Sequence, residues 1–247
     1  MCRFAAALLI LSLAAPATAT AADAPLKILT PAYGQAALQA LEPLIEARIG
    51  GAVDIEIVGT GGIPERILKD EKIDLVLTYK DSLADVAAKN RLQTQTDVAI
   101  SNVAIAVADA APMPVFKTSA DVAAFLKATP SLARSTSLSG QHMAAVIEKL
   151  GLTKEMEPKV QTSGGLPSNL LKEGKVAAAA QQISELKLAG LKNIVPLPAD
   201  LQKDLVLTAA TVQGTARADD VKKIVELLAS HDAAQAYANA GLKAFEK

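Results

Sequence analysis

Three turns rich in glycine and hydroxyl side chains carry the clearest chemistry of this sequence. They lie at residues 59–62, 139–140 and 163–165, and each precedes a segment of helical character. The first N–H groups of a helix have no partner within it and lie at the positive end of its dipole, so they bind anions. The same residues are common in ordinary turns, but three such turns meeting in one cleft favour an anion site. The candidate ligand residues in these turns are Thr60, Gly61, Ser139, Gly140 and Gly165.

Two further polar positions follow predicted strands. Tyr33 comes after the strand predicted at 26–29, where its phenol could donate to a ligand or simply pack half-buried. Gln181 and Gln182 end a later strand, and an amide both donates and accepts hydrogen bonds. Because side chains alternate along a strand, only one of the two glutamines is expected to face a ligand. We take Gln182 as the candidate.

His142 is the candidate for acid–base chemistry. It lies near the start of the helix predicted after Ser139, where the helix dipole disfavours a charged imidazole. A neutral imidazole can hydrogen-bond a carboxylate or serve as a general base. The alternative is a capping or surface histidine without a role in binding, and the sequence leaves both open.

Composition excludes several classes of function. The 247 residues carry a net charge of −1 without a basic stripe, and only 3% are aromatic, which disfavours a nucleic-acid partner. One cysteine and two distant histidines give no metal-ligand spacing, so we expect no metal. Dinucleotide and Walker fingerprints and a Gly-x-Ser-x-Gly elbow are absent from the sequence, so we expect neither a nucleotide cofactor nor a serine hydrolase.

The elements that must position these residues alternate between strands and helices. Strands are predicted at 26–29, 53–58, 73–78, 98–107 and 205–212. Helices are predicted at 35–48, 64–69 and 120–128, and a further helix, into which residues 138–142 lead, runs to Leu150. Short loops join them, which predicts an α/β fold with largely parallel sheets. In such folds ligands bind at the carboxyl ends of strands, where the next helix begins.

Two long apolar strands, at 98–107 and 205–212, divide the chain into three blocks. One arrangement accounts for this pattern: the outer blocks form one lobe, the middle block is inserted as a second lobe, and the two strands form the hinge. We therefore expect residues 22–104 and 208–247 in the first lobe and residues 105–207 in the second.

The N-terminus has the pattern of a secretory signal peptide. Arg3 precedes the apolar run 5–15, Pro16 ends that run, and small residues follow at Ala19 and Ala21. The run is shorter than the ~20 residues that cross a bilayer. We expect residues 1–21 to be removed and the product to be soluble in the periplasm, without cysteine and therefore without disulfides.

In order and spacing, four segments resemble the type II periplasmic solute-binding proteins, in particular the molybdate-binding branch that serves ABC importers. The resemblance covers residues 26–245 and is carried by the segments 59–67, 73–77, 139–152 and 176–201. It implies a two-lobed type II periplasmic-binding-protein fold with two mixed sheets and a two-strand hinge. It further implies a monomer that captures a small anionic solute, an oxyanion or a carboxylate, for a membrane ABC importer.

The chain departs from the molybdate binders at Tyr33, at Thr60-Gly61 and at Gln182, where those proteins have other residues. The patterns around His142 and Glu185 are closer to a branch that is similar to periplasmic aconitate isomerase. That resemblance implies an alternative in which His142 or Glu185 acts as a base and moves a double bond by proton transfer. The charge of the cleft separates the two readings, because a tricarboxylate favours an inward Arg or Lys such as Arg66 or Arg134.

Overall fold

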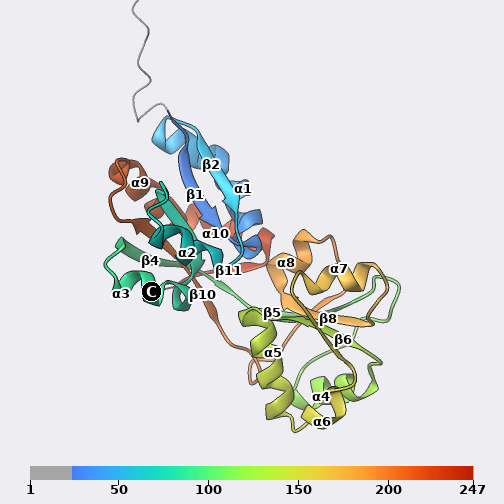
Figure 1. Cartoon of the computed structure of the whole chain (residues 1–247). Coiled ribbons are helices and arrows are strands. Elements are labelled where there is room, and N and C mark those ends of the chain that lie inside the picture. Colours follow the sequence, from blue (N-terminus) through green and yellow to red (C-terminus); the bar gives the residue numbers. More distant parts are fainter. Residues whose placement is uncertain (1–23, 247) are drawn as a thin grey trace, which may run out of the picture.

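The structure is a computed structural model that describes residues 24–246, so the predicted signal peptide at 1–21 lies outside the described residues. It contains a six-stranded and a five-stranded sheet, each the centre of one lobe. As Figure 1 shows, the N-terminal and C-terminal parts of the chain form the first lobe and the middle part forms the second. None of the helices within residues 24–246 is long and apolar enough to cross a membrane.

The elements of the first lobe are β1 (Leu26–Thr30), α1 (Ala32–Ile49), β2 (Val53–Ile57), α2 (Gly62–Leu68), β3 (Leu75–Tyr79), the short helix η1 (Lys80–Leu83), α3 (Ala84–Ala88), β4 (Leu92–Ser101), β10 (Leu205–Val212), α9 (Ala218–Leu228), α10 (His231–Ala240) and β11 (Leu242–Ala244). The elements of the second lobe are β5 (Val103–Val107), α4 (Ser119–Ala128), β6 (Leu132–Ser135), α5 (Leu138–Lys149), α6 (Thr153–Met156), β7 (Val160–Ser163), α7 (Pro167–Lys172), β8 (Ala178–Gln182), α8 (Ile183–Leu188) and β9 (Ile194–Pro196).

Both sheets are mixed, as expected, but parallel pairing is confined to part of each. In the order β11-β4-β10-β3-β1-β2, β1 pairs in parallel with β2 and β3, and the other neighbours are antiparallel. In the order β7-β6-β8-β5-β9, β6 pairs in parallel with β7 and β8. Each antiparallel pair contains β4, β5 or β10, which are strands next to the crossings between the lobes. The chain leaves the first lobe along β4 and returns along β10, so these two strands run in opposite directions.

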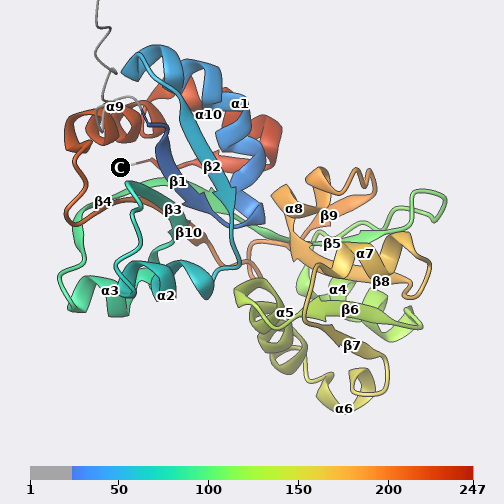
Figure 2. The ribbon, with the colours of Figure 1, turned by 45° about the horizontal axis from the view of Figure 1, so that its top comes forward.

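Helices cover both faces of each sheet, so the cores lie in layers. In the first lobe α1, α9 and α10 lie on one face and α2 and α3 on the other (Figure 2). In the second lobe α4, α5 and α6 cover one face and α7 and α8 the other. The central strands β3, β5 and β8 are buried along their whole length, which explains their continuous apolar or small-residue sequences.

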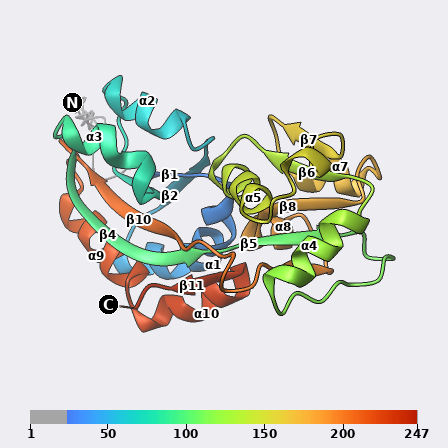
Figure 3. The same cartoon turned by 90° about the horizontal axis from the view of Figure 1, so that it is seen from below.

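The chain crosses between the lobes a few residues before each expected boundary. β4 ends in the first sheet at Ser101 and β5 begins in the second at Val103, so the single strand predicted at 98–107 is two strands separated by Asn102. The return crossing lies between Pro196 and Leu205 rather than at 207–208. Figure 3 shows β4 continuing into β5 across the middle of the molecule. The end of β4 and the whole of β5 are buried, and the polar pair Ser101-Asn102 lies at the crossing between them.

Helix α1 begins at Ala32, three residues before its predicted start, and continues through Pro43. Tyr33 is therefore helical rather than part of a loop. Gly34 permits this early start, because a methyl group there would overlap the hydroxyl of Thr30 at the end of β1. The close approach places the N-terminus of α1 at the carboxyl end of the first sheet.

An ion-pair network joins β1, β2 and α2 on the surface of the first lobe. Arg66 donates from Nη2 to Glu56 Oε2 at 2.9 Å and from Nε to Glu71 Oε2 at 2.6 Å, and Lys27 Nζ lies 3.1 Å from Glu56 and 3.0 Å from Glu71. Hydrogen bonds from Arg66, and then from Lys27, lower the pKa of both carboxyls to about 2. Arg66 therefore points away from any site between the lobes.

The network predicts a pH-dependent contribution to stability. We expect Arg66→Met to lower the free energy of unfolding by up to about 1 kcal/mol at neutral pH, the range of partly exposed ion pairs. A carboxyl with a lowered pKa stabilises the fold above its unfolded pKa of about 4.3 and loses that contribution as the pH falls through the folded value. The difference from wild type should therefore shrink as the pH falls to about 2. Urea unfolding across this range measures it.

Lys69→Met is the matched control. It removes the ion pair between Lys69 and Glu65, whose side chains are 71% and 62% exposed. We expect almost no change in the free energy of unfolding. An Arg66→Met deficit of the same size at both ends of the pH range would instead assign the effect of Arg66 to packing.

Candidate functional site

A cleft of about 520 Å³ lies between the two lobes. Its walls come from loops and helix starts that follow the strands of both sheets. The lining residues are Pro31, Ala32, Tyr33, Ile57, Val58, Gly59, Thr60, Gly61, Gly62, Ser135, Thr136, Ser137, Gly164, Gly165, Leu166, Pro167, Gln181, Gln182 and Glu185. Apart from Glu185, the polar residues of this lining are uncharged, and five of the lining residues are glycines.

Helices from both lobes begin at the cleft. In the first lobe α1 and α2 start there, and in the second lobe α5, α7 and α8 start there. Each start follows the carboxyl end of a strand, which is where α/β sheets hold ligands. Because the first N–H groups of a helix have no partner within it, these starts bring backbone donors and the positive ends of dipoles to one space.

Tyr33 lines the cleft from the first turn of α1, but its hydroxyl belongs to a buried network. Its Oη lies 2.9 Å from Thr78 Oγ1 and accepts from the N–H of Tyr79 at 3.2 Å, and its ring stacks on Tyr79 with centroids 4.1 Å apart. Ser82 donates to the carbonyl of Tyr79, so it accepts from Thr78, which in turn accepts from Tyr33. The phenol proton expected for a ligand is thus used inside the first lobe.

The second lobe brings hydroxyl groups to the cleft at residues 135–137, between β6 and α5. Ser135 Oγ lies 2.7 Å from Ser137 Oγ and accepts from the N–H of Ser137 at 3.3 Å. Thr136 and Ser137 are exposed, whereas Ser135 is buried at the strand end. This turn therefore presents two exposed hydroxyl residues at the beginning of a helix of twelve residues.

Gln181 and Gln182 both contribute to the floor of the cleft, since β8 ends there. Gln182 Oε1 accepts from Ser101 Oγ at 2.6 Å, which joins the two lobes at the crossing. Gln181 Oε1 accepts from the N–H of Ser168 at 2.9 Å, and its Nε2 has no hydrogen-bond partner within residues 24–246. Gln181 is only 1% exposed. Both glutamines belong to the cleft lining, so the choice of Gln182 over Gln181 stays a prediction.

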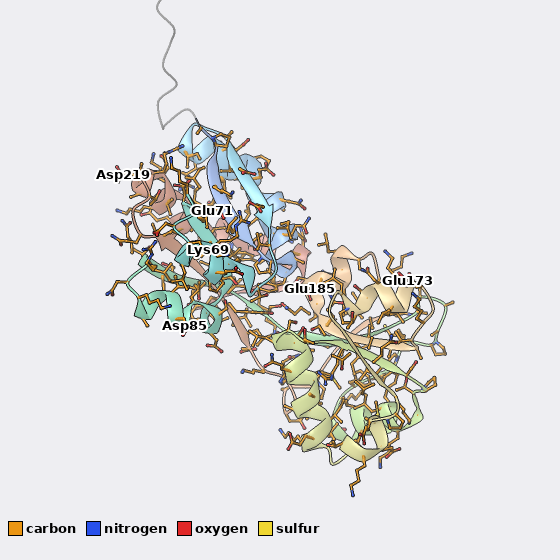
Figure 4. The ribbon with its side chains drawn as sticks, in the orientation of Figure 1. Lys69, Glu71, Asp85, Glu173, Glu185 and Asp219 are labelled. Carbon is orange, nitrogen blue, oxygen red and sulfur yellow. The ribbon has the colours of Figure 1, made fainter. Side chains whose placement is uncertain are left out.

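Glu185 is the charged side chain of the described cleft lining. It lies in the first turn of α8 and is 9% exposed. Burial raises its pKa to about 7, against the opposing effects of the Gln181 side chain and the Gln182 N–H. Figure 4 shows it at the junction of the lobes, whereas the other labelled acidic residues lie on outer surfaces.

The arginines that could have met carboxylates lie elsewhere. Arg66 is held in the surface network with Glu56 and Glu71. Arg134 Nη1 donates weakly, at 3.4 Å, to the carbonyls of Ser135 and Gly140, and its side chain lines a groove on another face of the second lobe. Neither is part of the described lining of the cleft.

The structure brings five of the eight predicted ligand residues to the cleft, namely Tyr33, Thr60, Gly61, Gly165 and Gln182. It leaves three outside that lining, namely Ser139, Gly140 and His142. Ser139 is fully buried within α5, with its hydroxyl 3.3 Å from that of Ser137. Gly140 packs against β6, where a methyl group would overlap the carbonyl of Ser135.

His142 contacts the return crossing rather than the cleft. Its Nε2 lies 2.8 Å from the carbonyl oxygen of Leu201, so the ring donates there. The side chain is half-buried, and burial lowers its pKa, which favours the neutral imidazole. Lys149 on the same helix donates to the carbonyl of Asp200 at 2.6 Å. His142 and Lys149 therefore attach α5 to the crossing.

Sequence reasoning missed Thr136, Ser137 and Gln181 as lining residues and named Glu185 only as a possible base. The hydroxyl run from Ser135 to Ser139 contained a signal, because a ligand lies immediately after a strand end rather than one helical turn later. The position of that strand end was not predictable from the run itself.

Comparison with known proteins identifies a family and structures with the same fold. A model of the family described as "Bacterial extracellular solute-binding protein" matches residues 26–243. The chain belongs to this family. As a solute-binding protein it shares the fold of the Azotobacter vinelandii periplasmic molybdate-binding protein, with a TM-score of 0.74, 15% identity, and coverage of 90% of this chain and 100% of that one.

Two further proteins are similar to this solute-binding protein, one in structure and one in sequence. The Mycobacterium tuberculosis sulfate-binding protein matches with a TM-score of 0.71 and 13% identity, over 90% of this chain and 87% of that one. An aconitate isomerase from Pseudomonas sp. is 26% identical over 216 residues, which cover 83% of this chain and 82% of the relative. The solved structures support the two-lobed fold. The aconitate isomerase is a relative that is an enzyme.

The packing role of Gly140 predicts a stability effect. We expect Gly140→Ala to lower the Tm by roughly 4–8 °C, from about 2 kcal/mol of overpacking against a backbone carbonyl that cannot rotate away. The matched control is Gly51→Ala, whose methyl group would lie 3.8 Å from Arg217, an ordinary contact. Circular dichroism melts compare the two variants, and equal melting temperatures would contradict the packing role.

Proposed function

We propose that this protein captures a small anion, an oxyanion or a carboxylate, between its lobes in the periplasm and presents it, as a monomer, to a membrane ABC importer. The observation that carries the proposal is the convergence of neutral donors from both lobes on one cleft. Helices α1 and α5 begin beside this cleft, whose lining includes Ala32 and Tyr33 and the exposed hydroxyl residues Thr136 and Ser137. Such donors hold an anion without a matching cation.

The charge of the cleft favours a compact oxyanion over a tricarboxylate. Three carboxylates carry more charge than neutral donors offset easily, and the described lining contains neither Arg nor Lys. Arg66 and Arg134 are held elsewhere. Membership of the solute-binding family and the fold shared with molybdate- and sulfate-binding proteins support the same reading.

A thermal-shift panel on residues 22–247 tests capture. Molybdate, tungstate, sulfate, phosphate, citrate and both aconitate isomers are compared. An anion that binds the folded state at about 100 times its Kd adds about 2.7 kcal/mol, which raises the Tm by roughly 5–10 °C. We expect such a shift with a tetrahedral oxyanion, and one bound anion per chain by calorimetry. A flat response to every anion would count against the proposal.

A pair of variants at one position isolates the charge of the ligand. Gly61 lines the cleft, has no neighbour within 4 Å of an added Cβ, and begins α2 with φ −72°. Asp and Asn are both accommodated there and are equally good helix caps. We expect Gly61→Asp to weaken anion binding at least about tenfold by repulsion over a few Å, while Gly61→Asn binds much more tightly. Equal affinities for the two variants would place the anion elsewhere.

A second candidate function is an aconitate-type isomerisation, favoured by Glu185 and by the 26% identical relative. A carboxyl whose pKa is about 7 can both take and return a proton at neutral pH. It would remove a proton from the CH₂ carbon beside a carboxylate, the electron pair would shift across the double bond, and the proton would return at the far carbon. Atoms and electrons balance without a cofactor.

Ultraviolet absorbance of cis- and trans-aconitate separates the two functions. The second candidate predicts conversion of one isomer into the other, and at least about a hundredfold loss of kcat in Glu185→Gln, the usual scale of a general base. The melting curve of the variant serves as the control for folding. Binding of an oxyanion together with an unchanged aconitate spectrum would leave capture as the function.

A further inference from the structure

Glu185 is a carboxyl group in a cleft whose proposed ligand is an anion. It lines the space itself and is 9% exposed. An ionised Glu185 and an anionic ligand would repel each other, and neither could donate a hydrogen bond to the other. If the Glu185 carboxyl carries a proton, it no longer repels the anion and can donate a hydrogen bond to it.

The surroundings of Glu185 contain further polar groups without partners. Gln181 Nε2 and Ser184 Oγ have no hydrogen-bond partner within residues 24–246, and both residues are 1% exposed. Buried polar atoms are rarely left unpaired in folded proteins. Gln181 lines the cleft, and its amide lies close enough to Glu185 to oppose the rise in the pKa of that carboxyl. The floor of the cleft thus offers an amide donor beside a carboxyl.

We propose that Glu185 holds the captured anion through its carboxyl proton, so that binding of a fully deprotonated oxyanion takes up one proton. This inference rests on the proposed capture of an anion in the cleft. Glu185 then acts as a specificity-determining residue: in its protonated form it donates to the anion, and in its ionised form it rejects it.

The groups around Glu185 do not titrate in the same pH range, so a change of charge near pH 7 can be assigned to Glu185. Tyr33 on α1 and Tyr79 on β3 are the phenols that interact with it, and burial raises the pKa of both, so they stay neutral in the physiological range. The strands β5, β8 and β9, which pack against α8, carry no charged side chain.

The remaining charges on neighbouring elements point elsewhere. Lys187, on α8 itself, donates to the carbonyls of Ala238 and Asn239 on α10. His231 and the acidic Asp232 of α10 lie at the opposite end of that helix. Those of α1 begin at Glu42, more than two turns beyond Tyr33. Glu185 is therefore the group in this part of the cleft whose charge changes near neutral pH.

Calorimetry with sulfate and molybdate measures the proton directly. Titrations at pH 7 in buffers of different ionisation enthalpy give the number of protons taken up, and we expect between zero and one, rising with pH. Affinity should fall about tenfold between about pH 6 and pH 8, because only the protonated fraction of a carboxyl with a pKa of about 7 is competent to bind.

Glu185→Gln keeps a donor of the same size and removes the titration. We expect this variant to bind with one affinity across the pH range and without proton uptake. Glu173→Gln is the matched control, since Glu173 is exposed on the outer surface of the second lobe beside Lys175, and it should keep the wild-type pH dependence. Wild-type binding that is independent of pH would overturn the inference and leave anion capture intact, whereas no binding at any pH would overturn both.

A measurement without ligand keeps the inference independent of the choice of anion. A carboxyl whose pKa is raised in the folded state stabilises the fold below its unfolded pKa of about 4.3, and that contribution is lost as the pH rises through about 7. Glu185→Gln should therefore melt several degrees above wild type at about pH 8 and close to it at about pH 4. An equal difference at both values would show that Glu185 is not held protonated.

Discussion

The two crossings between the lobes constrain the rest of the structure. Gln202, on the return crossing, accepts from the N–H of Val103 at 3.0 Å and donates to its carbonyl at 2.9 Å, so the two crossings are fastened to each other. Ser101 adds a bond of 2.6 Å to Gln182 at the end of β8. Because both connections meet at one place, a bend there would change the separation of the lobes. The cleft lies beside this point, since Gln182 lines it.

The distribution of charge follows from the same geometry. A cation buried in the cleft would need a permanent partner before a ligand arrives, and the described chain instead pairs Arg66 with carboxylates on the outer face of the first lobe. The helix starts that surround the cleft supply positive potential without a mobile charged side chain. Within the described lining, Glu185 is the side chain whose charge changes near neutral pH, because burial raises its pKa to about 7.

The sequence allowed the α/β architecture to be predicted, since elements with strong periodicity or continuous apolar runs depend little on distant contacts. β10 matches its predicted bounds for this reason. Residues of the predicted turns at 59–62 and 163–165 line the cleft because these turns follow strand ends, and their role in binding stays a prediction. Ser139, Gly140 and His142 were misplaced relative to the cleft, because their environment is tertiary. The partner of His142 is Leu201, 59 positions away, and no local pattern encodes that contact.

Capture and isomerisation both draw on Glu185, although they differ in the charge of the anion that the cleft must hold. Under the proposed capture Glu185 donates its proton to an anion, and under the alternative it exchanges a proton with carbon. Burial at the start of α8 suits both roles. The difference lies in the ligand: an oxyanion has no acidic C–H bond to present to the carboxyl, whereas an unsaturated polycarboxylate has one.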